Sequence, residues 1–276
     1  MPACSRRPAA LLLALATSLL LASCGDSSNQ TRLTVTGSST VAPLMAEIAL
    51  QFEKNHPDVR VDVQTGGSSR GVADARRGLA DIGMASRALN DDESDLTAHT
   101  IAYDGIGMIV HADNPVRALS PQQIIDIYQG RIDNWQAVGG PDAQIIVVNK
   151  AQGRSTLEIF LEHFELAAPS IKADVVIGDN EQGIKTVAGN PYALGYVSIG
   201  AAEYAVGADE PLRLLPLEGV EASTANVRNQ RYPMRRPLNL VTRGPLEGPA
   251  AALVAHAQSS SVDPLIRQLY FVIPQR

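Results

Sequence analysis

Hydroxyl side chains gather at three places where a strand-like segment ends and a helical pattern begins. The clusters are Ser38, Ser39 and Thr40 in "VTGSSTVAPL", Ser68 and Ser69 in "TGGSSRG", and Ser155 and Thr156 in "AQGRSTLEIF". A helix N-terminus has unpaired backbone N–H donors and a partial charge of about +0.5. Hydroxyl and N–H donors that point the same way form a site for an oxyanion. Helix capping is the alternative use of these side chains.

Two of the clusters follow the same plan. A β-rich run, a Gly-x-Ser-Thr segment and an amphipathic helix follow one another at Gly37–Thr40 and again at Gly153–Thr156. Apolar residues recur at i, i+3, i+4 and i+7 in both helices. The pairing predicts two α/β lobes whose hydroxyl-rich helix starts face each other across a cleft.

The middle cluster also matches the G-x-S-x-G pattern, with Ser68 as its central serine. A serine hydrolase that uses Ser68 as nucleophile is therefore an alternative function. The upstream HGGG-type loop of such enzymes is missing, and no motif surrounds the histidines. An anion receptor explains more of the sequence than an enzyme does.

Two arginines are candidates for binding an anion. Arg87 ends the strand-like segment "ADIGMASR", and open α/β sheets bind ligands beyond their strand ends. Arg154 lies inside the second Gly-x-Ser-Thr loop, which Lys150 opens. Arginine binds tetrahedral oxyanions through two parallel hydrogen bonds. A solvated surface position is the alternative for each of them.

The elements that must position these residues alternate between strand and helix patterns, which predicts an α/β fold. The expected strands are 33–36, 59–67, 80–86, 100–111, 143–150, 173–178, 193–200, 212–217 and 236–243. The expected helices are 40–54, 69–78, 120–130, 155–166, 181–189 and 249–258.

The N-terminus has the features of a secretory signal. Arg6 and Arg7 precede an apolar run over 9–21, and "LASC" ends at Cys24 in the manner of a bacterial lipoprotein. We expect a signal peptide over 1–23, lipid attachment to Cys24 and a polar tether over 24–31. Cleavage would leave Cys24 as the single cysteine, so the mature chain would have no disulfide and no cysteine metal site.

Composition narrows the class of protein further. The chain has 276 residues, of which 45% are hydrophobic and 19% charged, an ordinary globular balance. Its formal net charge of −6 disfavours nucleic-acid binding. Because metalloprotease, Walker A and full dinucleotide-binding motifs are missing, we expect neither a cofactor nor a metal.

Five segments together identify a resemblance. They are "TVTGSSTVAPL", "VQTGGSSRGVADARRGLADIGMASR", "IAYDGIGMIVHADNP", "IYQGRIDNWQAVGG" and "YPMRRPLNLVT". This chain resembles the phosphate-binding proteins of bacterial ABC phosphate importers. The resemblance implies a type II periplasmic-binding fold and a receptor without enzymatic activity. We expect lobe 1 over 32–107 and 208–276, and lobe 2 over 108–207.

The resemblance also implies partners and a site. The partners are inorganic phosphate and an ABC permease, and the expected location is the periplasm or the outer face of the cell membrane, as a monomer. The implied phosphate contacts are Ser39, Thr40, the Val41 N–H, Ser68, Arg87, Ser155 and Thr156. The second-lobe loop of the family usually reads R-x-x-G-S-G-T, but here it reads "KAQGRST". The change moves positive charge to Arg154 and keeps sulfate and molybdate open as ligands.

Selection of phosphate over sulfate requires a hydrogen-bond acceptor, because phosphate keeps a proton near neutrality and sulfate keeps none. A carboxylate in the cleft would accept that proton's hydrogen bond and repel sulfate. Asp104 in "AYDGIG" is the first candidate for this acceptor, and Asp81 in "ADIG" is the alternative.

Overall fold

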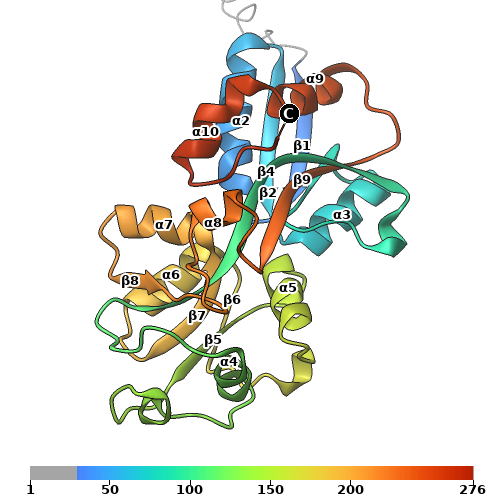
Figure 1. Ribbon diagram of the computed structural model, residues 1–276. Coiled ribbons are helices and arrows are strands. Elements are labelled where there is room, and N and C mark those ends of the chain that lie inside the picture. The colour runs from blue at the N-terminus through green and yellow to red at the C-terminus, as the bar shows by residue number, and fades with distance from the viewer. Residues whose placement is uncertain (1–29, 276) are drawn as a thin grey trace, which may run out of the picture.

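The computed structural model describes residues 30–275, which form two α/β lobes joined by extended strands (Figure 1). Its strands are β1 (Thr31–Gly37), β2 (Val59–Thr65), β3 (Ile82–Ala85), β4 (Leu96–His111), β5 (Ile146–Lys150), β6 (Val175–Ile177), β7 (Ala193–Ser198), β8 (Leu212–Leu214) and β9 (Arg235–Arg243). Its α-helices are α2 (Ala42–Asn55), α3 (Ser68–Arg77), α4 (Pro121–Tyr128), α5 (Ser155–His163), α6 (Asn180–Ala188), α7 (Ile199–Gly207), α8 (Thr224–Arg228), α9 (Gly248–Ala257) and α10 (Asp263–Gln268). The expected signal peptide, Cys24 and most of the expected tether lie outside the described residues.

Lobe 1 is built on one end of the sheet, where the strand order is β2-β1-β3-β9-β4. β1 runs parallel to β2 and β3, while β9 is antiparallel to both β3 and β4. Helices α2, α9 and α10 share a core with these strands, in which Leu44, Ile48, Leu240 and Leu253 are completely buried. The apolar positions predicted for the first helix therefore face the sheet.

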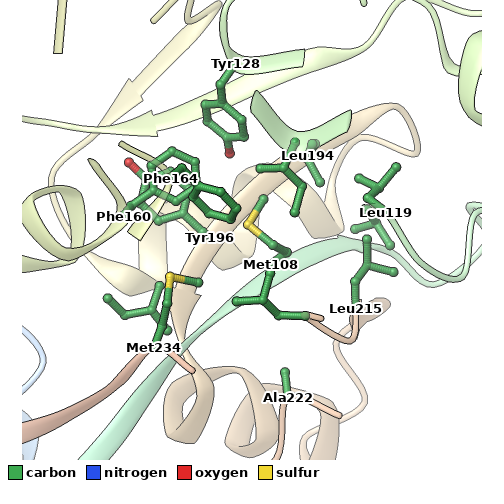
Figure 2. Close-up of a cluster of buried hydrophobic side chains, with 14 of the residues drawn as sticks. Met108, Leu119, Tyr128, Phe160, Phe164, Leu194, Tyr196, Leu215, Ala222 and Met234 are labelled. Atoms are coloured by element: carbon green, nitrogen blue, oxygen red, sulfur yellow. The ribbon is translucent and has the colours of Figure 1, made fainter. Parts of the chain in front are cut away.

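Lobe 2 continues the sheet in the order β4-β7-β5-β6, with β8 paired to the end of β4. β5 is parallel to both β6 and β7. Its core contains a group of aromatic side chains (Figure 2): the rings of Phe160 and Tyr196 stack with centroids 4.0 Å apart, and Tyr128 and Phe164 pack at an angle to Phe160. This packing anchors α5, whose first residues reach the cleft.

β4 is the strand that passes from one lobe to the other (Figure 1). Residues 96–105 pair with β9 in lobe 1, and residues 106–110 pair with β7 in lobe 2.

The chain returns from lobe 2 to lobe 1 later than the expected boundary at residue 207. β8 pairs with the lobe 2 end of β4, and Leu215, Val227 and Met234 are buried in the lobe 2 core. The chain re-enters lobe 1 only at the start of β9, because the apolar residues between 212 and 234 complete the other core.

Within residues 30–275, none of the helices combines the length and the apolar composition that a membrane span requires.

Candidate anion-binding site

Hydroxyl groups from both lobes meet where β1, β3 and the starts of α3 and α5 come together. The Ser155 Oγ of lobe 2 shares hydrogen bonds with Ser68 Oγ at 2.9 Å and Ser86 Oγ at 2.6 Å, both from lobe 1. Ser38 Oγ donates to Ser86 Oγ at 2.9 Å. These four side chains are 1–2% exposed. The cleft is therefore closed in this structure, and its innermost contacts are between hydroxyls.

Arg236 supplies the positive charge of this cluster. Its Nη1 donates to Thr156 Oγ1 at 2.9 Å, and its Nη2 donates to Thr40 Oγ1 at 3.3 Å. The other side of the guanidinium donates to Asp104 Oδ2, at 2.9 Å from Nη2 and 3.2 Å from Nε. Both side chains of this ion pair are 1% exposed. A buried cation thus touches hydroxyls of both lobes and is held by a buried carboxylate.

The register of the crossing strands explains this pair, because Asp104 of β4 lies directly opposite Arg236 of β9. Residues opposite each other in an antiparallel pair project to the same face. The second carboxylate oxygen, Asp104 Oδ1, accepts the Gly200 N–H at 3.2 Å. Burying an unpaired charge costs free energy, and the contacts with Asp104 offset that cost for Arg236.

The helices that start at the cleft do not use their hydroxyls as caps. α2, α3 and α5 have no hydrogen bond from a side-chain cap, whereas Ser120, Asp179, Ser198 and Ser223 cap α4, α6, α7 and α8. α9 and α10 also lack such a cap, and α2, α9 and α10 each have a proline in the first turn, which has no N–H to satisfy. Ser38 Oγ accepts the N–H groups of Thr40 and Val41, at 3.2 and 3.4 Å, just before α2. The other hydroxyls at these helix starts are not used as caps.

Two glycines allow the loops of the two lobes to meet. Gly67 has a φ of +97°, and a Cβ atom there would lie 2.5 Å from the carbonyl oxygen of Gly153 in the other lobe. The Ser69 N–H donates to that same carbonyl at 3.3 Å. Any larger residue at 67 would hold the lobes apart, so glycine is required for this approach.

Lys150 is buried behind the second-lobe loop. Its Nζ donates to the Asp179 carbonyl at 2.6 Å and to Asn180 Oδ1 at 3.2 Å. Burial is the largest influence on this amine and, with the nearby charge of Arg236, lowers its pKa to about 7. Lys150 therefore contacts the site through Asn180, whose Nδ2 donates to Thr40 Oγ1 of lobe 1 at 3.1 Å.

Not every residue that we expected at the site joins the cluster. The structure brings Thr40, Ser68, Ser155 and Thr156 together there. Val41 lies beside it, where its N–H bonds Ser38. Ser39 is half-buried and lines a cavity of about 540 Å³ between the lobes.

Arg87 is bound by carboxylates rather than by the cluster. Its guanidinium donates to both oxygens of Glu93, at 2.7 and 2.8 Å, and to Glu158 Oε2 of lobe 2 at 2.8 Å. Burial alone would raise the pKa of Glu93, but hydrogen bonds from Arg87 and from the Asn90 N–H outweigh it and lower that pKa. Glu158 also accepts from Ser69 Oγ at 2.8 Å, so it links α5 to two residues of lobe 1.

Arg154 is half-buried beside Gly67 and Gly178, and its side chain makes no hydrogen bond or ion pair with the residues that the structure describes. Asp81 is exposed and accepts the Thr34 N–H at 2.8 Å, which is a structural contact at the start of a strand. Asp104 lies at the site, but its contacts are with Arg236 and Gly200.

The contacts of Ser68 do not resemble those of a catalytic nucleophile. Its Oγ accepts the Ser86 N–H at 3.1 Å and bonds the Ser155 hydroxyl. A serine nucleophile requires a base within hydrogen-bond reach, and neither of these groups is one. In the part of the chain that the structure describes, no group of acidic, histidine or cysteine side chains is placed to hold a metal ion.

Three site residues were missed as candidates from the sequence: Ser86, Asn180 and Arg236. Ser38 was named in the first hydroxyl cluster but not among the implied phosphate contacts. Arg236 carried a detectable signal, because a charged residue precedes the apolar strand pattern "PLNLVT" and Asp104 interrupts another such pattern. Two opposite charges inside predicted strands indicate a buried pair. Asn180 carried none, since it looks like an ordinary residue in the first turn of a helix.

Comparisons with known proteins identify relatives of this chain. The PBP superfamily domain matches residues 24–275. A phosphate ABC transporter substrate-binding protein from Clostridium perfringens, solved with bound phosphate, is 32% identical, with a TM-score of 0.82 over 89% of this chain and 100% of that chain. An ABC-type phosphate transport receptor from Vibrio cholerae is 29% identical, with a TM-score of 0.73 over 88% of this chain and 100% of that chain.

A curated relative gives the same result. The phosphate-binding protein PstS of Bacillus subtilis is 28% identical over 244 residues, which cover 86% of this chain and 79% of that protein. The predicted resemblance and the type II periplasmic-binding fold are thereby confirmed. The chain belongs to the PstS family of phosphate ABC transporter substrate-binding proteins, within the PBP superfamily.

Proposed function

We propose that this protein is the extracytoplasmic phosphate receptor of an ABC importer and has no enzymatic activity of its own. The observation that supports this most strongly is Arg236, a buried cation that donates to hydroxyls of both lobes. Charge-assisted hydrogen bonds bind an oxyanion well, and a site assembled from two lobes encloses its ligand when they close. The bound protein would deliver phosphate to the permease as a closed unit.

The anion contacts that we propose are Ser38, Thr40, Ser68, Ser86, Ser155, Thr156 and Arg236. Asp104 would offset the charge of Arg236, and Glu158 with Arg87 would hold the closed state. Arg154 stays a candidate, because it carries a charge at the start of α5 for which the described residues supply no partner.

Calorimetry against phosphate, sulfate and molybdate tests the proposal directly. We expect one phosphate site per chain, no turnover, and binding at least tenfold weaker in Ser155→Ala, because a hydrogen bond to a charged group contributes about 1.5–3 kcal/mol. Ser120→Ala, which removes the cap of α4 away from the cleft, is the matched control and should bind like the parent. Preference for another anion would reassign the ligand, and covalent fluorophosphonate labelling of Ser68 would favour the hydrolase.

We also propose that Cys24 carries a lipid anchor that holds the receptor at the membrane. The "LASC" segment after a short apolar run supports this. Cys24→Ser should release the protein or leave its signal peptide uncleaved, as shown by fractionation and intact mass. An unchanged membrane fraction with unchanged mass would refute the anchor.

A further inference from the structure

Thr40 is the site hydroxyl whose hydrogen-bonding role is most narrowly defined. A threonine hydroxyl has one O–H donor and two acceptor lone pairs. Thr40 Oγ1 accepts from Asn180 Nδ2 at 3.1 Å and from Arg236 Nη2 at 3.3 Å. Since both lone pairs are occupied, the O–H is left to donate. No described residue accepts from it, and the side chain is 4% exposed.

The amide of Asn180 can adopt only one orientation in this environment. Its Oδ1 faces the Ser198 N–H at 3.3 Å and the Lys150 amine at 3.2 Å. A backbone N–H can only donate, so the amide atom that faces the Ser198 N–H must be the oxygen. Its NH₂ group therefore points across the cleft at Thr40, which lies in the other lobe.

We propose that Asn180 is a positioning residue that commits the Thr40 hydroxyl to donating a hydrogen bond to the bound anion. The inference rests on the proposed phosphate-binding function and adds a role for a residue that lies behind the anion contacts. Because Asn180 and Thr40 belong to different lobes, the commitment exists only in the closed state. In an open state the hydroxyl rotates freely, so closure enhances anion binding beyond the contacts that it brings together.

Asn180→Asp reverses the proposed polarity with little change in shape. The new carboxylate accepts from Thr40 instead of donating to it, which turns the O–H away from the anion. Lys150 lies within reach of the new carboxylate and limits the change in net charge. Asn180→Ala removes one donor but leaves the Thr40 O–H free. We expect phosphate affinity to fall about tenfold or more in Asn180→Asp, and only a few-fold in Asn180→Ala.

A double-mutant cycle with Thr40→Val separates this effect from charge repulsion and from loss of an interlobe contact. We expect Asn180→Asp to weaken phosphate binding far more in the parent than in Thr40→Val, where no hydroxyl remains to be turned. Thr40→Ser keeps the hydroxyl and should restore the full effect of Asn180→Asp. Circular dichroism confirms folding, and the ranking of the two Asn180 variants tests the inference even if Thr40→Val fails to fold.

Different experimental results would overturn this inference alone or the proposed function together with it. An equal loss of affinity in both Thr40 backgrounds, or a larger loss in Asn180→Ala than in Asn180→Asp, would overturn the inference and leave the receptor function intact. A parent protein that binds no phosphate would overturn the proposed function and this inference with it.

Discussion

Glu158 of α5 should control how tightly the two lobes close. Its carboxylate accepts from Ser69 Oγ and from Arg87 Nε, both at 2.8 Å, and both donors belong to lobe 1. A hydrogen bond to a charged group contributes about 1.5–3 kcal/mol, and a partly exposed ion pair about 0.2–1 kcal/mol. The Glu158 side chain is 36% exposed, so the low end of both ranges applies. Together they stabilise closure by about 2 kcal/mol, or roughly thirtyfold.

Glu158→Ala should therefore weaken phosphate binding by roughly tenfold to thirtyfold. The loss should appear as faster dissociation, because these bonds form only after the anion has entered the open cleft. Stopped-flow fluorescence of a cleft-labelled protein measures both rate constants. Arg87 keeps Glu93 as its partner in the variant, so stability should change little.

Glu162→Ala is the matched control. Glu162 is exposed, lies one turn further along the same helix and, with Glu158, lines a cavity of about 770 Å³. It should bind phosphate with the rates of the parent. If Glu158→Ala keeps the dissociation rate of the parent, or if Glu162→Ala loses as much affinity, the reasoning about an interlobe contact is refuted.

Three further predictions concern the buried charges. Arg236→Met in an Asp104→Asn background, which avoids an unpaired carboxylate, should abolish detectable phosphate binding in calorimetry. The circular dichroism spectrum should stay unchanged. Retained binding would show that the hydroxyls suffice. Asp104→Asn alone should strengthen phosphate and sulfate binding by a similar factor, because the carboxylate is engaged by Arg236; a selective gain for sulfate in competition assays would instead restore Asp104 as the acceptor for the phosphate proton. Lys150 has its pKa lowered from 10.5 to about 7, so between these values the unfolded state binds more protons, and the free energy of unfolding should rise with pH. Urea denaturation at about pH 6.5 and about pH 9 should show this rise in the parent and not in Lys150→Met. An equal change of the free energy of unfolding with pH in both proteins would contradict the prediction.

The sequence predicted most of the fold because its local signals agree with the tertiary structure. The helix expected over 155–166 is α5 at Ser155–His163, and the strand expected over 236–243 is β9 at Arg235–Arg243. α7 was missed, because Ser198, which caps it, directly ends β7 and "SIGAAEYAVG" continues the apolar run without a break. No turn residue separates the two elements, so periodicity alone cannot place their boundary.

The site was predictable where its residues are neighbours in the chain and unpredictable where they are not. Ser155 and Thr156, which the structure places in the hydroxyl cluster, were named from the sequence because both belong to one loop and one helix start. Arg87 was expected to contact the anion, but its environment includes Glu158 from the other lobe, 71 residues away. The role of Arg236 likewise depends on the register between β4 and β9. Such contacts are set by topology, which no local pattern encodes.

The uncapped starts of α2, α3 and α5 have a consequence for how the protein unfolds. Their first turns are the parts of these helices most prone to fraying, because the first N–H groups of a helix have no partner within it. An anion that bonds hydroxyls and N–H groups of all three would act as a shared cap for helices that belong to two separate cores. Without it, the two cores are coupled through β4 and through the direct contacts across the cleft. With it, fraying at any of the three helices breaks contacts that the others need, so the ligand makes two folding units behave as one.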